Sequence, residues 1–212
     1  MGEKTMSARD RILGRIRRVS GTAETPAPLR PAISRAQDRV GQFTAQAEGV
    51  QASTSRIAHI DDLPAALADE LRKRNLPAQI RTGEDALFDR DWGTVERSKG
   101  TGRLAEPATL TRAQMGVAET GSLVFTSGPD NPVTLNFLGE THFAVVGAAD
   151  VVDGYEEVWA TLSQRDRPRT VNFVTGPSRS GDIGQTLQLG AHGPVGLHIF
   201  VVDDMGGSAT PD

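Results

Sequence analysis

The chain has 212 residues, enough for one domain with an extension and for a sizeable hydrophobic core. Its formal net charge of −4 gives no reason to expect nucleic acid as a partner, and the absence of cysteine excludes disulfides, thiolate metal ligands, iron–sulfur ligation and a cysteine nucleophile within these residues. No apolar run approaches the roughly 20 residues of a membrane span, and no apolar segment follows the basic N-terminus, so we expect a cytoplasmic protein with no signal peptide and no membrane span.

The N-terminal residues 1–35 predict a helix followed by a linker. Ser7 begins a sequence typical of a capped helix start. The apolar residues that follow fall on one arc of a helix: Ile12, Leu13, Ile16 and Val19. Arginines flank this arc, so the helix could lie on a membrane, dock on a partner or pack on its own domain. We interpret it as a docking element, because a stretch rich in Pro, Ala and Thr separates it from the main domain.

The main domain is predicted over residues 36–204, with a flexible tail over residues 205–212. Its first helix is expected to contain Val40, Phe43 and Ala47. Residues 53–60 then predict a strand, a helix capped by Asp61 or Asp62 follows, and residues 78–81 predict a second strand. A strand, a helix and a strand within about thirty residues form a βαβ unit, which implies parallel pairing.

The second half of the domain alternates apolar segments with polar loops. Two short apolar segments flank residues 119–122 and predict a β-hairpin, whereas residues 92–110 show no clear pattern. Further strands are predicted at residues 142–146, 171–174 and 197–202. A short helix is predicted at residues 133–138, and a capping box at Asp153 is expected to open another. The inward face of that helix is predicted to hold Tyr155, Val158, Trp159 and Leu162.

The loop after Val174 carries the features expected of a ligand site. A strand that stops in a Gly/Ser loop leaves backbone N–H groups free to face a crevice, and ligands of open α/β sheets bind beyond the carboxyl ends of the strands. Arg179 adds the planar donor fork that suits a carboxylate or a phosphate. The same residues could instead form a surface turn with a solvated arginine, or Arg179 could pair with Asp182 and brace the loop.

The four histidines do not have the spacing of metal ligands, and no metal site is predicted. His59, His142 and His198 alternate with apolar residues inside predicted strands, which favours hydrogen-bonded residues of a sheet over ligands. His192 lies in a tight loop near a strand end and is the candidate for a functional histidine. Nucleophile-elbow and nucleotide-triphosphate motifs are absent from the sequence.

Four motifs, in this order, are together similar to the LUD (lactate utilization) domain, and within it to the lactate-utilisation protein C, or YkgG, family. They are A-E-T-G-S-L at 118–123, T-G-P-S-R-S-G-D-I at 175–183, Q-T-L-Q-L-G at 185–190 and H-G-P at 192–194. The resemblance covers roughly residues 36–204. It implies an α/β fold of the NagB/RpiA/CoA-transferase-like type, with three layers, a mainly parallel central sheet and an N-terminal helical extension.

The resemblance also implies a role in the bacterial oxidation of L-lactate to pyruvate, as one of three subunits. The implied partners are a Cys-rich protein of the heterodisulfide-reductase type and a second LUD protein that bears iron–sulfur clusters. A chain without cysteine, a flavin motif or a dinucleotide fingerprint is then expected to carry no cofactor of its own. It would bind a small anionic ligand, organise the cluster-bearing partners, or do both. The alternative is a free-standing enzyme, as in the CoA transferases and sugar-phosphate isomerases of this fold.

We expect the site where four segments converge: residues 118–122, 127–131, 175–182 and 190–193. Glu119 is the candidate catalytic residue, as an acid/base or as a group that orients the ligand. The candidate ligand-binding residues are Thr120, Gly121, Ser127, Gly176, Ser178, Arg179, Ser180, Asp182 and His192. Glycines in these segments would let the backbone approach a ligand closely.

Overall fold

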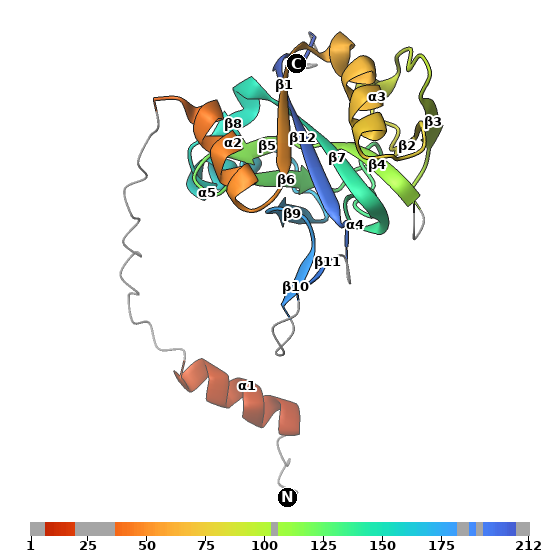
Figure 1. The fold of residues 1–212 in the computed structure, drawn as a ribbon. Coiled ribbons are helices and arrows are strands. Elements are labelled where there is room, and N and C mark those ends of the chain that lie inside the picture. The colour runs from red at the N-terminus through yellow and green to blue at the C-terminus, as the bar shows by residue number, and fades with distance from the viewer. Residues whose placement is uncertain (1–6, 20–36, 103–105, 182–186, 190–192, 207–212) are drawn as a thin grey trace, which may run out of the picture. The chain divides into compact units, whose positions relative to one another are not determined.

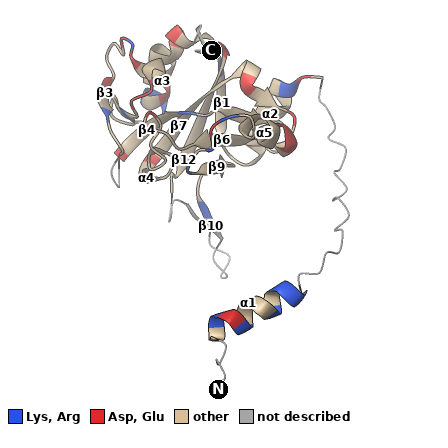
Figure 2. Ribbon diagram, turned by 180° about the vertical axis from the view of Figure 1, so that it is seen from behind, with Lys and Arg blue, Asp and Glu red and all other residues tan. Residues whose placement is uncertain are grey.

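A computed structural model describes five parts of the chain: residues 7–19, 37–102, 106–181, 187–189 and 193–206 (Figure 1). The chain divides into two compact units, Met1–Ala32 and Ile33–Asp212. In the first unit the predicted helix is present as α1 (Ala8–Val19), and the hydroxyl of Ser7 caps it by accepting from the backbone N–H of Asp10 at 3.2 Å. Its sequence contains five arginines, and Figure 2 shows basic residues along the helix. Its docking role and the predicted domain boundaries stay predictions.

The second unit is built on a six-stranded, wholly parallel sheet. Its strands lie in the order β1 (Ser53–His59), β12 (Gly196–Asp204), β7 (Gly139–Gly147), β4 (Glu106–Arg112), β2 (Gln79–Thr82) and β3 (Glu96–Lys99). The prediction of a mainly parallel α/β fold is confirmed. Direct pairing of the first two predicted strands is wrong, because β12, β7 and β4 lie between β1 and β2.

A second sheet has four strands in the order β8 (Val151–Val152), β5 (Met115–Val117), β6 (Ser122–Thr126) and β9 (Val171–Val174). Strands β5 and β6 are antiparallel neighbours, which confirms the predicted hairpin around residues 118–121. After β9 the chain forms a small antiparallel pair, β10 (Arg179–Gly181) with β11 (Leu187–Leu189). In Figure 1 this pair extends away from the two sheets.

Helices and the second sheet cover the two faces of the parallel sheet. Helix α3 (Leu63–Lys73) packs on one face through Leu63, Leu67 and Leu71. Helix α2 (Arg39–Gly49) and the second sheet cover the opposite face, where Phe43 and Phe125 lie in one buried cluster. The remaining short helices are η1 (Ile60–Asp62), η2 (Ala86–Phe88), α4 (Leu135–Leu138) and η3 (Ala148–Asp150).

Helix α5 (Tyr155–Leu162) packs on the outer side of the second sheet through Val158 and Leu162. Two predictions for this helix are wrong. Trp159 is 53% exposed rather than inward, and its ring lies 5.6 Å from that of Phe173 at the surface. Its N-cap is Gly154 rather than Asp153, so the predicted capping box is not formed.

Candidate functional site

A cavity of about 270 Å³ lies where the loop after β9 meets the amino-terminal parts of β7 and β12. Its walls come from α4, β7, β9, the loop at residues 175–178, the turn before β12 and the start of β12: Asn136, Phe137, His142, Phe173, Val174, Thr175, Gly176, Pro177, Ser178, Gly193, Pro194 and Leu197. The backbone N–H of Ser178 donates to the carbonyl of Pro194 at 2.9 Å, which joins the two loops. The cavity therefore faces the amino ends of the parallel strands, not the carboxyl ends that the sequence argument assumed.

Two buried side chains of the cavity, His142 and Asn136, are connected through Thr111 on β4. Thr111 Oγ1 donates to Asn136 Oδ1 at 2.9 Å and lies 2.7 Å from His142 Nε2. All three residues are about 1% exposed. Within the described part of the chain, His142 Nδ1 and Asn136 Nδ2 have no hydrogen-bond partner. Two residues of the cavity wall thus each hold a buried polar atom with unused hydrogen-bonding capacity.

Burial lowers the pKa of His142 to about 3, because the imidazolium ion is poorly solvated there. The side chain is therefore neutral at physiological pH, with one protonated nitrogen and one lone pair. Its ring lies 5.5 Å from that of Phe125. A neutral imidazole in an apolar wall can position or polarise a ligand without a competing charge.

Predicted segments 175–182 and 190–193 both reach the cavity, through Gly176, Ser178 and Gly193. The 118–122 turn adjoins it through a cluster of hydroxyl groups. Ser122 Oγ lies 2.6 Å from Thr175 Oγ1 and 2.9 Å from the hydroxyl of Tyr155. The predicted residue Thr120 joins the same cluster, with its Oγ1 2.8 Å from Ser122 Oγ.

Gly121 and Gly176 lie against helix α2. Both have positive φ angles, +68° and +77°. A Cβ atom at Gly121 would lie 2.2 Å from the backbone nitrogen of Ala47, and one at Gly176 would lie 2.4 Å from the carbonyl oxygen of Val50. The close approach that these glycines permit is therefore to the end of α2. Packing against α2 therefore explains the glycines at positions 121 and 176, which belong to the first two motifs quoted above.

The carboxylate of Glu119 lies at the start of α5, where its Oε1 accepts from the backbone N–H of Tyr155 at 3.4 Å. Arg179 is exposed on β10, directly after Ser178, and Ser180 is the next residue of the same strand. Both residues directly follow Ser178, which lines the cavity. Asp182 and His192 lie outside the described residues, so their predicted roles and the pairing of Arg179 with Asp182 stay predictions.

Ser127 lies at the far end of the second sheet from the cavity. Its hydroxyl accepts from the backbone N–H of Thr170 at 2.9 Å, and its own N–H donates to the carbonyl of Thr170 at 3.0 Å. Because β6 and β9 are antiparallel, Thr126 pairs with Val171 while the opposite end of β6 faces the cavity loop. Five strand residues separate the two ends by roughly 17 Å. The structure does not bring the 127–131 loop to the cavity.

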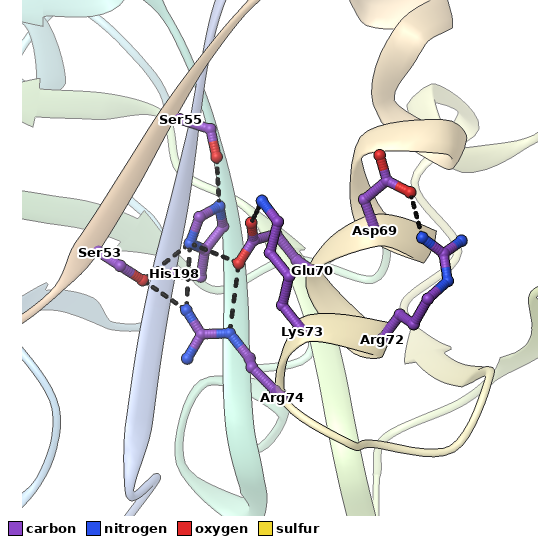
Figure 3. A network of polar contacts seen from close by, with 8 residues as sticks. All are labelled: Ser53, Ser55, Asp69, Glu70, Arg72, Lys73, Arg74 and His198. Atoms are coloured by element: carbon purple, nitrogen blue, oxygen red, sulfur yellow. Dashed lines mark hydrogen bonds and ion pairs between the residues drawn. The ribbon is translucent and has the colours of Figure 1, made fainter.

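The second buried histidine, His198 on β12, lies on the α3 face of the sheet (Figure 3). Its Nδ1 lies 2.8 Å from Ser53 Oγ and its Nε2 lies 2.6 Å from Ser55 Oγ. Burial lowers the pKa of His198 to about 4, although the charge of Glu70 opposes the shift. The imidazole is therefore neutral, and its 3.6 Å contact with Glu70 is not an ion pair at physiological pH.

The arrangement resembles a Ser–His–Glu triad, but its hydrogen bonds have the wrong direction. Arg74 Nη2 lies 3.3 Å from His198 Nδ1 and can only donate, so Nδ1 accepts and the proton is on Nε2. Nε2 then donates to Ser55 and cannot act as its base. The expectation that His198 is a hydrogen-bonded residue of the sheet is confirmed.

Thr111 and Asn136 were not among the residues predicted for the site, and His142 was predicted to be a hydrogen-bonded residue of the sheet. His142 does lie in the predicted strand, but only one of its nitrogens has a partner in the described chain. The sequence does hold a signal for both residues. Asn136 is a polar residue within a short apolar helix, and Thr111 is a polar residue within a buried strand.

The described residues contain no group of three or more His, Asp or Glu side chains that could hold a metal ion. None of the helices in that part of the chain is long and apolar enough to cross a membrane.

Residues 103–202 match the family model of the LUD domain. Lactate utilization protein C of Anoxybacillus flavithermus is 32% identical over 95 residues, which cover 45% of this chain and 43% of that protein. Lactate utilization protein C of Bacillus licheniformis is 34% identical over 107 residues, covering 47% and 45%. The matched part therefore spans less than half the length of these relatives. The resemblance noted from the motifs is confirmed.

The fold has a counterpart among solved structures. The crystal structure of a DUF162 family protein from Deinococcus radiodurans matches with a TM-score of 0.59 and 21% identity. The match covers 77% of this chain and 96% of that one. At this identity the likeness supports the fold and nothing further.

Proposed function

Because the chain carries a LUD domain, we propose that it acts in lactate utilization and that its cavity binds a small carboxylate of that metabolism, such as lactate or pyruvate. Relatives named lactate utilization protein C support the metabolic role. The observation that carries the binding role is the cavity, whose wall combines the polar residues Asn136, His142 and Ser178 with apolar side chains.

A buried polar atom without a hydrogen bond costs about 1–3 kcal/mol, and native proteins contain few of them. Here two lie on side chains of one cavity wall, His142 and Asn136, which the same threonine binds. Both atoms are buried, so a ligand would remove these costs only where the two side chains turn toward the cavity. The other walls are largely apolar, with Phe137, Phe173 and Leu197, and suit a methyl group beside a polar head.

We propose further that the chain is a non-redox subunit. Oxidation of lactate requires an acceptor of two electrons, and that chemistry belongs to cofactors. The 212 residues contain no cysteine with which to ligate an iron–sulfur cluster. The electrons would then pass to Cys-rich and iron–sulfur partner subunits, while this chain holds the organic acid. Arg179 remains the candidate partner of the carboxylate, because it follows Ser178 at the cavity wall.

Calorimetric titration of the full chain with L-lactate, pyruvate and inorganic phosphate tests the binding role. His142→Phe removes the ring nitrogens but keeps a ring beside Phe125, and should weaken lactate binding about tenfold, the equivalent of one hydrogen bond. His59→Gln is the matched control, since His59 is exposed and should not affect binding. Equal affinities in the wild type and in His142→Phe would rule out the cavity as the site.

Arg179→Ala and Glu119→Gln test the two charged candidates. Arg179→Ala should weaken binding of both carboxylates together, because a charge-assisted bond contributes about 1.5–3 kcal/mol. Glu119→Gln separates a ligand role from the contact with Tyr155, which the amide oxygen of Gln can keep. Unchanged carboxylate binding in folded Arg179→Ala would remove this residue from the site.

Co-expression with Cys-rich and iron–sulfur lactate-utilisation proteins tests the subunit role. The expected result is a stable complex that oxidises L-lactate to pyruvate, whereas the purified chain alone shows no turnover. Turnover of lactate, a CoA thioester or a sugar phosphate by the chain alone would support the free-standing enzyme instead.

A further inference from the structure

We infer that α5, residues 165–169 and the outer edge of β9 together form an interaction surface, and that this β9 surface binds an extended, acidic segment of a partner protein. It has a cavity of its own, which shares no lining residue with the cavity proposed for the organic acid. The β9 surface is therefore independent of the ligand named in the proposed function.

Strand β9 is the last strand of the second sheet, and no described strand pairs with its outer edge. The backbone N–H of Ser127 donates to the carbonyl of Thr170 at 3.0 Å, which makes these two residues a hydrogen-bonded pair beside the ladder of β6 and β9. In antiparallel strands such pairs alternate with pairs whose N–H and C=O groups point away from each other. Val171 and Phe173 therefore direct their backbone groups to the outer edge.

The opposite edge of the same sheet, at β8, is partly covered. The guanidinium group of Arg39 donates there to the carbonyl of Val151 at 3.1 Å and forms an ion pair with Asp153 at 2.9 Å. An exposed edge strand is a template for pairing with another chain, so proteins usually cover it or place charges on it. The four residues of β9 carry no charge, which leaves its outer edge suited to a partner strand.

A cavity of about 350 Å³ lies where the end of α5 meets the start of β9. Its walls are Trp159, Leu162, Ser163, Arg167, Pro168 and Val171. Trp159 is 53% exposed, and its ring lies 5.6 Å from that of Phe173. Tryptophan and arginine are the residue types most enriched among those that dominate the binding energy of protein interfaces. The cavity therefore suits an apolar side chain of a partner.

The segment before β9 determines the charge of that partner. Residues 165–169 contain three exposed arginines, Arg165, Arg167 and Arg169, and one acidic residue, Asp166. Arg167 and Arg169 have no hydrogen-bond or ion-pair partner for their guanidinium groups within the described part of the chain. The segment is thus basic in a chain whose net charge is −4. Guanidinium groups form their strongest hydrogen bonds with carboxylates, so charge complementarity favours an acidic partner.

An extended segment can use all three features at once. Its backbone pairs with the outward groups of Val171 and Phe173, an apolar side chain enters the cavity beside Trp159, and a carboxylate meets Arg167. A second copy of this chain fits less well. Antiparallel pairing of two β9 strands about their centre would set residues 165–169 against residues 176–180 of the other copy, which include an arginine and no acid.

The experiment is a fluorescence-anisotropy titration of the full chain with two labelled peptides. The first is Glu-Glu-Val-Leu-Val-Glu-Glu, which has acidic residues at both ends, so that either strand direction places carboxylates beside residues 165–169. The second has lysine in place of every glutamate. The wild type should bind the acidic peptide at least about tenfold more tightly than the basic one.

Three variants test the three features. Arg167→Glu and Trp159→Ala should each weaken binding of the acidic peptide about tenfold or more. Val171→Pro removes an N–H group that points away from β6, and should weaken it to a similar extent, whereas Val171→Thr keeps that group and the affinity. Arg72→Glu is the matched control, because it makes the same charge change at an exposed arginine of α3 and should alter the affinity by no more than about twofold.

No binding of the acidic peptide by the wild type at about 1 mM would overturn the proposal. Equal affinities in the wild type, Arg167→Glu and Trp159→Ala would do the same, and these two substitutions change exposed side chains, so the test stands even if Val171→Pro does not fold. Equal binding of the two peptides would refute the acidic partner. Self-association of the wild type in sedimentation, lost in Trp159→Ala, would show a second copy as the occupant instead. None of these outcomes changes the case for lactate binding in the other cavity.

Discussion

His142 and His198 lie on neighbouring strands of one sheet, β7 and β12, and face opposite sides of it. They are equally buried, at 1% and 2% exposure, and burial lowers the pKa of both far below the ordinary value of 6.5. They differ in their hydrogen bonds. Both nitrogens of His198 have serine partners, whereas only one nitrogen of His142 has a partner in the described residues, the hydroxyl of Thr111, and the residue lines the cavity.

The comparison shows that a perturbed pKa does not by itself locate a site. Burial is the largest cause of the shift for both imidazoles, and the one with several charged neighbours, Glu70, Lys73 and Arg74, is the one that does not line the cavity. What separates the two histidines is that His142 lines a cavity and has one nitrogen without a partner in the described part of the chain.

The same substitution at both positions should have very different costs. His198→Phe leaves Ser55 without its imidazole partner and adds volume where the ring already lies 4.5 Å from Phe200, so we expect a loss of about 3 kcal/mol. His142→Phe leaves Thr111 bonded to Asn136 and can expand into the cavity, so its cost should stay below about 1 kcal/mol. Urea denaturation at pH 7 measures both. Equal costs would show that His142 is as much a structural residue as His198.

The protein should also become less stable as the pH is lowered, because both histidines have lowered pKa values in the folded state. Their pKa values in the folded protein, about 3 and about 4, are below the ordinary 6.5, so between these values the unfolded chain binds more protons. The free energy of unfolding therefore decreases as the pH falls below 6.5. From pH 7 to pH 5.5 the loss is about 1 kcal/mol for each histidine.

His142→Phe should remove about half of this pH dependence. Urea denaturation of the wild type and the variant at the two pH values provides the measurement. A profile that is flat in the wild type would mean that both imidazoles can be protonated without cost in the folded protein.

Much of the fold follows from local sequence patterns. The hairpin at β5 and β6, helix α3 and strands β7, β9 and β12 were all predictable, because apolar spacing and turn residues specify an element locally. The order of the strands was not. Three strands separate β1 from β2, and that arrangement depends on which faces pack together over long sequence separations.

Strand β4 was missed for a reason connected with the site. The buried residues of β4 alternate between its two faces. Apolar side chains such as Ala108 and Leu110 lie on the α3 face, and the threonines Thr109 and Thr111 lie on the other. A strand buried on both faces usually appears as an apolar run, and these threonines interrupt it. Thr111 lies 31 residues from His142 in the sequence, so their contact appears only in the folded chain.

Thr109 offers the smallest and most direct test of the comparison. Its hydroxyl is fully buried and has no partner within the described ranges, like the free atoms of the cavity, but the residue does not line the cavity. Thr109→Val keeps the shape and removes the unsatisfied group, so stability should rise by up to about 1 kcal/mol. Thr111→Val should lower it by about 1–2 kcal/mol, since two hydrogen bonds are lost.

Urea denaturation of the two valine variants side by side makes this test. A stabilised Thr109→Val would show that a buried polar atom in this layer is costly when it has no partner. The free atoms of His142 and Asn136 would then be a cost that the fold retains beside a cavity, where a ligand can offset it. A destabilised Thr109→Val would instead mean that a water molecule binds this hydroxyl. The same explanation would then apply to the cavity, and a free polar atom there would no longer indicate a ligand.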